Sequence, residues 1–130
     1  MGLTWAAIFI FEEYDNAIKR GAEIIGEIVG FSMTSDAGDI VRPNKDGAKA
    51  AMTLALSDAK INCSEIGYIN AHGTGTILND KTESFAINEV FNGVFDSPLV
   101  SSTKSLHGHL IGGAGAIELV SCLMSLNDGI

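Results

Sequence analysis

Residues 99–118 read LVSSTKSLHGHLIGGAGAIE, and this stretch decides the fold that we expect. The short apolar run at its start is typical of a buried strand, and it ends in hydroxyl side chains and Lys104. Two histidines follow, and a glycine-rich step then leads into an apolar helical stretch from about Gly113 to Leu126. A strand that ends in a polar, glycine-rich loop before a helix is a unit of an α/β fold.

A second stretch upstream repeats this layout. Residues 70–76 read NAHGTGT and follow an apolar strand that we expect at residues 66–69. A helix capped by Asn79, running to about Asn92 and stopped by Gly93, separates the two strands. The apolar side chains expected on its buried side are Phe85, Ala86, Val90 and Phe91. The spacing of apolar residues predicts another helix over residues 47–60.

Residues 47–130 therefore follow an α-β-α-β-α order. Strands that alternate with helices predict a parallel sheet, with helices on both of its faces. Because the carboxyl ends of neighbouring parallel strands meet at one edge of a sheet, we expect the loops of His72 and Lys104 to lie side by side. The last helix, apolar on most faces, is expected to be largely buried.

The first 46 residues carry a different pattern. Residues 6–11 and 23–31 are apolar runs, separated by the charged, helix-compatible residues 12–20, so we expect an antiparallel strand pair within residues 1–32. Gly26 and Gly30 in the second run are candidates for a bulge or a close backbone approach. Residues 33–46 are rich in Ser, Asp, Gly and Asn, which predicts a loop.

Composition excludes several classes of protein. The formal net charge of −8 argues against a nucleic-acid partner, because phosphate binding needs clustered Lys and Arg. The two cysteines, Cys63 and Cys122, lack metal-binding or redox spacing, which favours reduced thiols and a cytoplasmic protein. No apolar run reaches the roughly 18 residues of a membrane span, and no basic segment precedes the first apolar run as in a signal peptide.

The two loops carry the candidate chemistry. His72 and His109 can both donate hydrogen bonds near neutral pH, and Lys104 adds a positive field. The hydroxyl donors beside them are Thr74, Thr76, Ser102, Thr103 and Ser105. Such a set is suited to stabilising negative charge that develops on a carbonyl oxygen.

Four other chemistries have weaker support in the sequence. Ser101 to Lys104 match the S-x-x-K pattern of serine-lysine acylases, but the partner motifs are absent. Residues 108–115 lack the spacing of a phosphate-binding loop. A metal site built from His72, His109, Asp80 and Glu83 would match no short ligand signature. Neither cysteine is placed as a nucleophile beside a histidine.

The two motifs together resemble the β-ketoacyl-acyl-carrier-protein synthases, the condensing enzymes of fatty acid and polyketide synthesis. Residues 70–76 with Asp80 and Glu83 are similar to the family's N-A-H-G-T-x-T…D…E segment. Residues 102–116 are similar to its S-T-K-S…G-H…G-A-x-G-A segment, with the lysine-to-histidine spacing kept. The resemblance covers nearly the whole chain and implies a thiolase-like α/β fold, from the closing strand pair of its first half into most of its second half.

The resemblance also implies roles for individual residues. His72 and His109 would hydrogen-bond the malonyl thioester carbonyl and promote decarboxylation, with Lys104 maintaining their electrostatics and position. Thr74 and Thr76 would contact the pantetheine arm of the substrate. Asp80 and Glu83 would belong to a supporting polar network around Lys104. The implied partners are acyl carrier protein, malonyl and acyl thioesters and a second copy of the synthase, with no metal and no cofactor beyond carrier-bound phosphopantetheine.

Two departures from the family pattern bear on the site. Val41 replaces the hydroxyl residue that commonly stands before the proline of the loop, and His107 stands where threonine is common. The resemblance further implies that the acyl-accepting cysteine and the last strand pair lie outside this chain. We therefore expect the isolated chain not to condense acyl thioesters. The alternative is a non-catalytic partner, a chain-length-factor-like or degenerate subunit that only dimerises or binds carrier protein.

Overall fold

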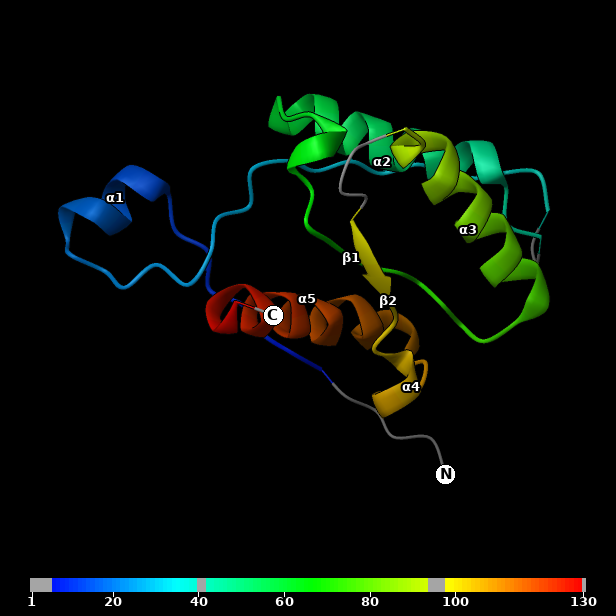
Figure 1. The fold of residues 1–130 in the computed structure, drawn as a ribbon. Coiled ribbons are helices and arrows are strands. Elements are labelled where there is room, and N and C mark those ends of the chain that lie inside the picture. The colour runs from blue at the N-terminus through cyan, green and yellow to red at the C-terminus, as the bar shows by residue number, and fades with distance from the viewer. Residues whose placement is uncertain (1–5, 40–41, 94–97, 130) are drawn as a thin grey trace. The chain divides into compact units, whose positions relative to one another are not determined.

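The computed structural model describes residues 6–39, 42–93 and 98–129. The chain divides into two compact units, one of Val29–Ser105 and one of Met1–Ile28 with Leu106–Ile130. The elements, labelled in Figure 1, are α1 (Tyr14–Lys19), α2 (Lys45–Ala59), the 3₁₀ turn η1 (Cys63–Glu65), β1 (Tyr68–Asn70), α3 (Ile77–Phe91), β2 (Leu99–Ser101), α4 (Lys104–His107), the 3₁₀ turn η2 (Ile111–Gly113) and α5 (Ala114–Asp128). No helix among these residues is long and apolar enough to cross a bilayer.

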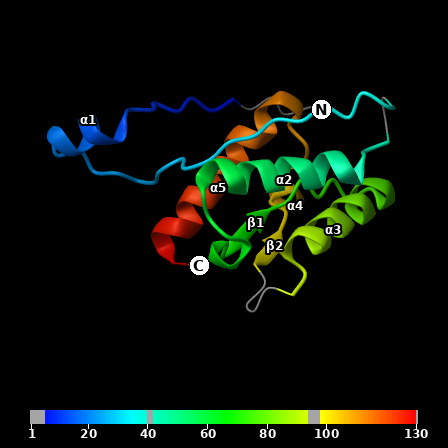
Figure 2. The ribbon, with the colours of Figure 1, turned by 90° about the horizontal axis from the view of Figure 1, so that it is seen from above.

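The unit Val29–Ser105 is built on a parallel strand pair. β1 and β2 pair in register from Tyr68 opposite Leu99 to Asn70 opposite Ser101. α3 connects the end of β1 to the start of β2, as a parallel connection requires, and the predicted α-β-α-β-α order is confirmed (Figure 2). The two carboxyl ends therefore open at the same edge of the pair, which is where the sequence places both polar loops.

α2 and α3 pack against each other in this unit. α2 begins at Lys45, because the side chain of Asn44 accepts a 3.0 Å hydrogen bond from the Asp46 amide, and it ends at Ala59 before the left-handed Lys60. Gly30 lies so close to α2 that a Cβ there would stand 2.6 Å from the Ala59 methyl, which confirms the close approach expected of this glycine.

Three charged side chains join α2 to α3. The Glu89 carboxylate on α3 accepts from Lys49 Nζ at 3.0 Å and from Lys45 Nζ at 3.2 Å. The Lys49 and Lys45 ammonium groups lower the pKa of Glu89, while Glu89 raises the pKa of Lys45. This solvent-exposed cluster is a small contribution to stability that salt screens.

Glu89→Gln is expected to lower the unfolding temperature at pH 7 and low salt. A carboxyl group whose pKa is lower in the folded state stabilises the fold above its unfolded pKa of about 4.3, and this contribution is lost as pH falls through the folded value. The difference between the variant and the original chain should therefore shrink below about pH 4 and in 1 M salt. Thermal denaturation followed by circular dichroism measures it; a difference that is independent of pH and salt would contradict the assignment.

The structure corrects the predicted start and the predicted buried side of α3. The helix begins at Ile77 with Thr76 as its N-cap, so the expected cap Asn79 lies inside the first turn, where its side chain donates to Asp80 instead. Of the side chains expected on the buried side, Ala86 and Phe91 are buried but Phe85 is exposed. The end of the helix is confirmed, since it stops at Phe91 and Gly93 then adopts a left-handed φ of +79°.

The second unit contains α1, α4's last residues, η2 and α5. α1 confirms the helical connection expected within residues 12–20, and Arg20, just after the helix, donates from Nε to the carboxylate of Glu12, just before it, at 2.8 Å. Gly26 lies against α5, because a Cβ there would stand 2.7 Å from the Leu123 side chain. α5 runs from Ala114 to Asp128, but the expectation that it is largely buried is wrong: its exposed apolar side chains are Val120, Met124 and Leu126.

The antiparallel strand pair expected within residues 1–32 does not form among the described residues. Residues 6–11 and 23–31 are extended without ladder pairing, and Ile8 and Ile10 are 93% and 95% exposed. An apolar run reports a preference for burial, whereas a strand also needs a neighbour that takes its backbone hydrogen bonds. The described part of the chain offers these two runs no such neighbour, and residues 1–5 lie outside it.

Candidate functional site

Two side chains at the ends of β1 and β2 join the loops that follow. Asn70, the last residue of β1, donates from Nδ2 to Thr103 Oγ1 at 3.2 Å and accepts from the Thr103 amide at 3.4 Å. The Ser102 hydroxyl lies within 3.2 Å of the Gly73 carbonyl and 3.3 Å of the His72 carbonyl, and it accepts from the Lys104 amide at 3.3 Å. The loop of His72 and the loop of Lys104 therefore lie side by side, as predicted.

Glu83 fixes the loop of His72 from α3. One carboxylate oxygen accepts from the His72 amide at 2.6 Å and the other accepts from the Gly73 amide at 2.8 Å. Hydrogen bonds from backbone amides to an ionised carboxylate are stronger than neutral ones. Glu83 thus holds the backbone that carries His72, and the resemblance implies that it also supports Lys104.

Glu83→Gln is expected to lower the free energy of unfolding by about 1.5–3 kcal/mol, the size of a charge-assisted hydrogen bond. The amide nitrogen that replaces one oxygen would face a backbone N–H, donor against donor. Urea denaturation measures the loss. Ser84→Ala, next along α3 and exposed, is the matched control and should change stability little; equal losses in the two variants would contradict the role of Glu83.

Lys104 is placed as the first residue of α4, directly after this junction. The residue is only 7% exposed. A charge withdrawn from water acts through a lower effective dielectric constant, so its field is stronger at short range than that of an exposed lysine.

His109 and His107 use their Nδ1 atoms in opposite ways. His109 Nδ1 accepts a 3.1 Å hydrogen bond from the Ile111 amide, and a backbone N–H can only donate, so the proton of the neutral ring sits on Nε2. His107 Nδ1 lies 2.8 Å from the Gly108 carbonyl, which can only accept, so here Nδ1 carries a proton. His109 therefore carries its N–H at the outer nitrogen, whereas His107 uses its Nδ1–H within the turn.

The remaining predicted residues have local partners. The hydroxyls of Thr74 and Thr76 lie 2.9 Å apart in the loop after His72, and Asp80 accepts from Asn79 Nδ2 at 3.1 Å. His109 belongs to the unit that contains Leu106–Ile130, whereas His72 and Lys104 belong to Val29–Ser105. Val41, one of the departures from the family pattern, lies outside the described residues.

Sequence reasoning missed the cross-links made by Asn70 and Ser102. Asn70 ends β1 and Ser102 directly follows β2, and these positions were the available signal, but the contacts depend on a register that pairs Asn70 with Ser101. The Ser101 hydroxyl is hydrogen-bonded to the Tyr68 hydroxyl at 2.8 Å. Cys63 lies in η1, before β1 and so at the opposite end from the loops. Within the described ranges no three His, Cys, Asp or Glu side chains gather as a metal site requires.

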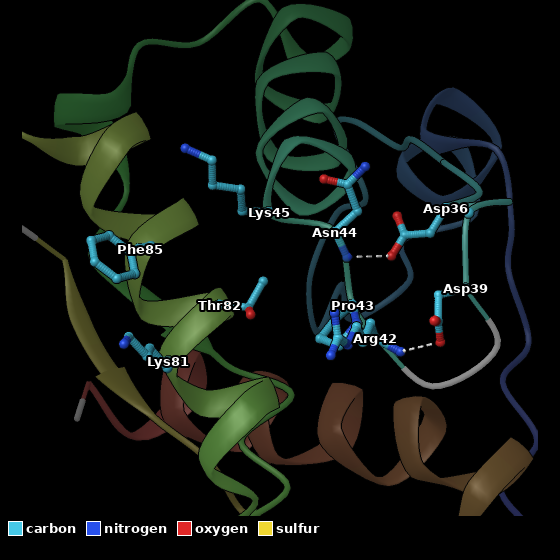
Figure 3. A pocket seen from close by; sticks show the side chains of 10 residues that line it. Asp36, Asp39, Arg42, Pro43, Asn44, Lys45, Lys81, Thr82 and Phe85 are labelled. Atoms are coloured by element: carbon cyan, nitrogen blue, oxygen red, sulfur yellow. Dashed lines mark hydrogen bonds between the residues drawn. The ribbon is translucent and has the colours of Figure 1, made fainter.

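A hollow of about 430 Å³ lies elsewhere in the unit Val29–Ser105 (Figure 3). It is lined by residues of the loop before α2 and of α3, namely Asp36, Gly38, Asp39, Arg42, Pro43, Asn44, Lys45, Lys81, Thr82 and Phe85. Asp36 accepts from the Asn44 amide at 2.7 Å and Asp39 from the Arg42 amide at 3.0 Å. Charges of both signs line it and none of the predicted site residues does, so it is separate from the junction of the two loops.

Known proteins resemble this chain along almost all of its length. Residues 25–130 match the family described as beta-ketoacyl synthase, C-terminal domain. Nodulation protein E of Rhizobium sp. (strain N33) is 45% identical over 125 residues, which cover 96% of this chain and 31% of that protein. 3-oxoacyl-[acyl-carrier-protein] synthase 2 of Synechocystis sp. is 46% identical over 125 residues, or 95% and 30%. The chain thus spans about a third of the length of these relatives.

Solved structures agree. A beta-ketoacyl synthase from Burkholderia phymatum STM815 superposes with a TM-score of 0.84 at 40% identity, covering 90% of this chain and 28% of that one. A chain from the structure of a type II PKS acyl-carrier protein in complex with its ketosynthase superposes with a TM-score of 0.80 at 36% identity. The match covers 88% of this chain and 28% of that one. The expected α/β fold of the thiolase-like ketosynthases is confirmed.

Proposed function

This chain belongs to the β-ketoacyl synthase family, whose C-terminal domain it carries, and from that premise we propose that it supplies the decarboxylating side of a β-ketoacyl-acyl-carrier-protein synthase. The whole reaction would be a decarboxylative Claisen condensation of malonyl-acyl carrier protein with an acyl thioester, in fatty acid or polyketide synthesis. No residue of this chain matches the acyl-accepting cysteine, so that nucleophile would come from outside these 130 residues.

Decarboxylation breaks the bond between the malonyl carboxylate and the central carbon. The electron pair of that bond moves into the thioester, CO₂ leaves, and negative charge develops on the thioester oxygen. Two N–H donors aimed at this oxygen stabilise the charge more in the transition state than in the substrate. His72 and the outer nitrogen of His109 would be these donors, and the resulting enolate carbon would then attack the acyl thioester.

One observation carries the proposal: the Ser102 hydroxyl contacts the carbonyls of His72 and Gly73 and the amide of Lys104. This places a histidine loop and a buried ammonium group at the same end of a parallel strand pair. Lys104 would add a fixed positive field beside the developing oxyanion. Glu83, by binding two backbone amides, would fix the direction in which His72 leaves β1.

The substrate would arrive on a carrier. Thr74 and Thr76 follow His72 in the same loop, and we assign to them contact with the pantetheine arm, with Asp80 in the polar network that supports the site. The phosphopantetheine belongs to the substrate carrier, so no separate cofactor is needed. The partners would be acyl carrier protein and a second copy of the synthase, in the cytoplasm.

A chimeric synthase tests this function. In the chimera, this chain replaces the matching 125 residues of the Synechocystis 3-oxoacyl-[acyl-carrier-protein] synthase 2. The proposal expects condensation of malonyl- and acyl-acyl carrier protein by the chimera, and none by the isolated 130-residue chain. A chimera that folds and dimerises like its parent but releases no CO₂ from malonyl thioester would contradict the proposal and favour the alternative of a non-catalytic partner subunit.

A further inference from the structure

α4 ends in a second histidine, His107, at the start of the turn that leads to η2. We infer that His107 is a positioning residue for His109: it acts by binding the Gly108 carbonyl and touches no substrate itself. Its importance for the reaction rests on the proposed function of His109. The contact between His107 and Gly108 does not depend on that function.

His107 binds the peptide group that links Gly108 to His109. The Gly108 carbonyl and the His109 amide belong to the same plane, because a peptide bond is rigid. His107 Nδ1 donates to that carbonyl at 2.8 Å and so fixes the orientation of the plane from which His109 starts. Gly108 has φ +73°, a conformation open to glycine, so without an outside contact its carbonyl would sample several directions.

The backbone on the other side of His109 is strained at Ile111. Ile111 has φ +51°, which is costly for a β-branched residue and persists only where neighbouring contacts impose it. In this conformation the Ile111 amide donates to His109 Nδ1 at 3.1 Å. His109 is thus held between two hydrogen bonds, one to its own ring and one, through His107, to the peptide before it.

The two rings differ in their chemistry. His107 uses its Nδ1–H inside the turn, whereas His109 uses Nδ1 as an acceptor and carries its proton on Nε2. In their neutral forms the two rings are therefore not interchangeable donors. His107 acts by fixing the orientation of the Gly108 carbonyl. Another side chain with a hydrogen-bond donor at the position of Nδ1 should therefore be able to take over this role.

Two variants of equal size separate the donor from the bulk of the ring. Asn places an N–H₂ group where His107 has Nδ1, and Leu places a methyl group there. In the full 130-residue chain labelled with ¹⁵N, the Ile111 amide should exchange with solvent about 2- to 10-fold faster in His107→Leu, the range for one lost hydrogen bond. The His109 ring signals should also move away from the pattern of a proton on Nε2. His107→Asn should resemble the original chain in both respects.

Unchanged Ile111 exchange and unchanged His109 ring signals in His107→Leu would overturn the inference. The same holds if His107→Asn behaves like His107→Leu, because the donor would then not be the cause. These readouts require no turnover. If the chimera lacks activity while His107→Leu still loosens the turn, the proposed function fails and the positioning role remains; if the chimera is active and the turn does not respond, only the positioning role fails.

Discussion

His109→Ala in the chimeric synthase is expected to slow CO₂ release from malonyl thioester by about 10²–10³-fold, the usual cost of removing one donor from an oxyanion site. We expect the substitution to slow the decarboxylation step itself. The His109 ring is exposed, and its Nδ1 accepts from the Ile111 amide, so Nε2–H is the donor with which this ring would meet a substrate oxygen. Release of labelled CO₂ under single-turnover conditions measures the step.

A matched pair of amides tests which nitrogen matters. Gln places its N–H₂ group near the position of Nε2 in His109, whereas Asn places it near Nδ1. We expect His109→Gln to recover part of the lost rate and His109→Asn to recover none. Equal rates in all three variants, or rates within about two-fold of the unmodified chimera, would contradict the donor role, since one donor is worth at least 10² in comparable sites.

Gly73→Ala is expected to lower the free energy of unfolding by about 2–5 kcal/mol, from backbone strain and overpacking together. Gly73 has φ +43°, which any other L-residue adopts at a cost. An added Cβ would also collide with the Ser102 side chain, so Ser102 would have to leave its contacts with the His72 carbonyl and the Lys104 amide. Urea denaturation of the chain measures the loss.

Gly75→Ala is the control for Gly73→Ala. Gly75 has φ +77°, but a Cβ there would meet nothing within 4 Å, so this variant carries the backbone cost alone. It should destabilise by about 1–2 kcal/mol. Ser102→Gly should recover the overpacking part of the Gly73→Ala loss, because it removes the atoms that collide, but not the backbone cost or the hydrogen bonds of Ser102 itself. Equal losses at both glycines, with no rescue by Ser102→Gly, would show that the close approach of the two loops is not a feature of the folded chain.

The parallel strand pair and the adjacency of the two loops could be predicted from the sequence. A helix between two short apolar runs allows a parallel connection, and that connection puts the residues after both strands at one edge. His72, Glu83 and Lys104 accordingly lie at or beside one junction. The contacts of Ser102 and Asn70 could not be predicted, because they depend on which residue of β1 faces which residue of β2.

Other features oppose the local preferences on which sequence reasoning depends. Ile111 has a β-branched side chain, which prefers a negative φ, yet its φ is positive because the surrounding turn imposes this conformation. Asn79 is a good cap, but the helix starts two residues earlier, at Ile77. Residues 6–11 and 23–31 have the composition of strands and stay unpaired among the described residues, since composition does not supply the neighbouring strand.

In the proposed mechanism, the N–H groups of His72 and His109 would stabilise negative charge on one thioester oxygen. A malonyl thioester analogue with a sulfonate in place of the carboxylate cannot lose CO₂, and ¹³C in its thioester carbonyl reports how strongly that carbonyl is polarised. In the chimera we predict a downfield ¹³C shift on binding that is reduced in His72→Ala, reduced in His109→Ala and absent in the double variant. A bound carbonyl signal at the position of the free analogue, or one that neither substitution moves, would contradict the account.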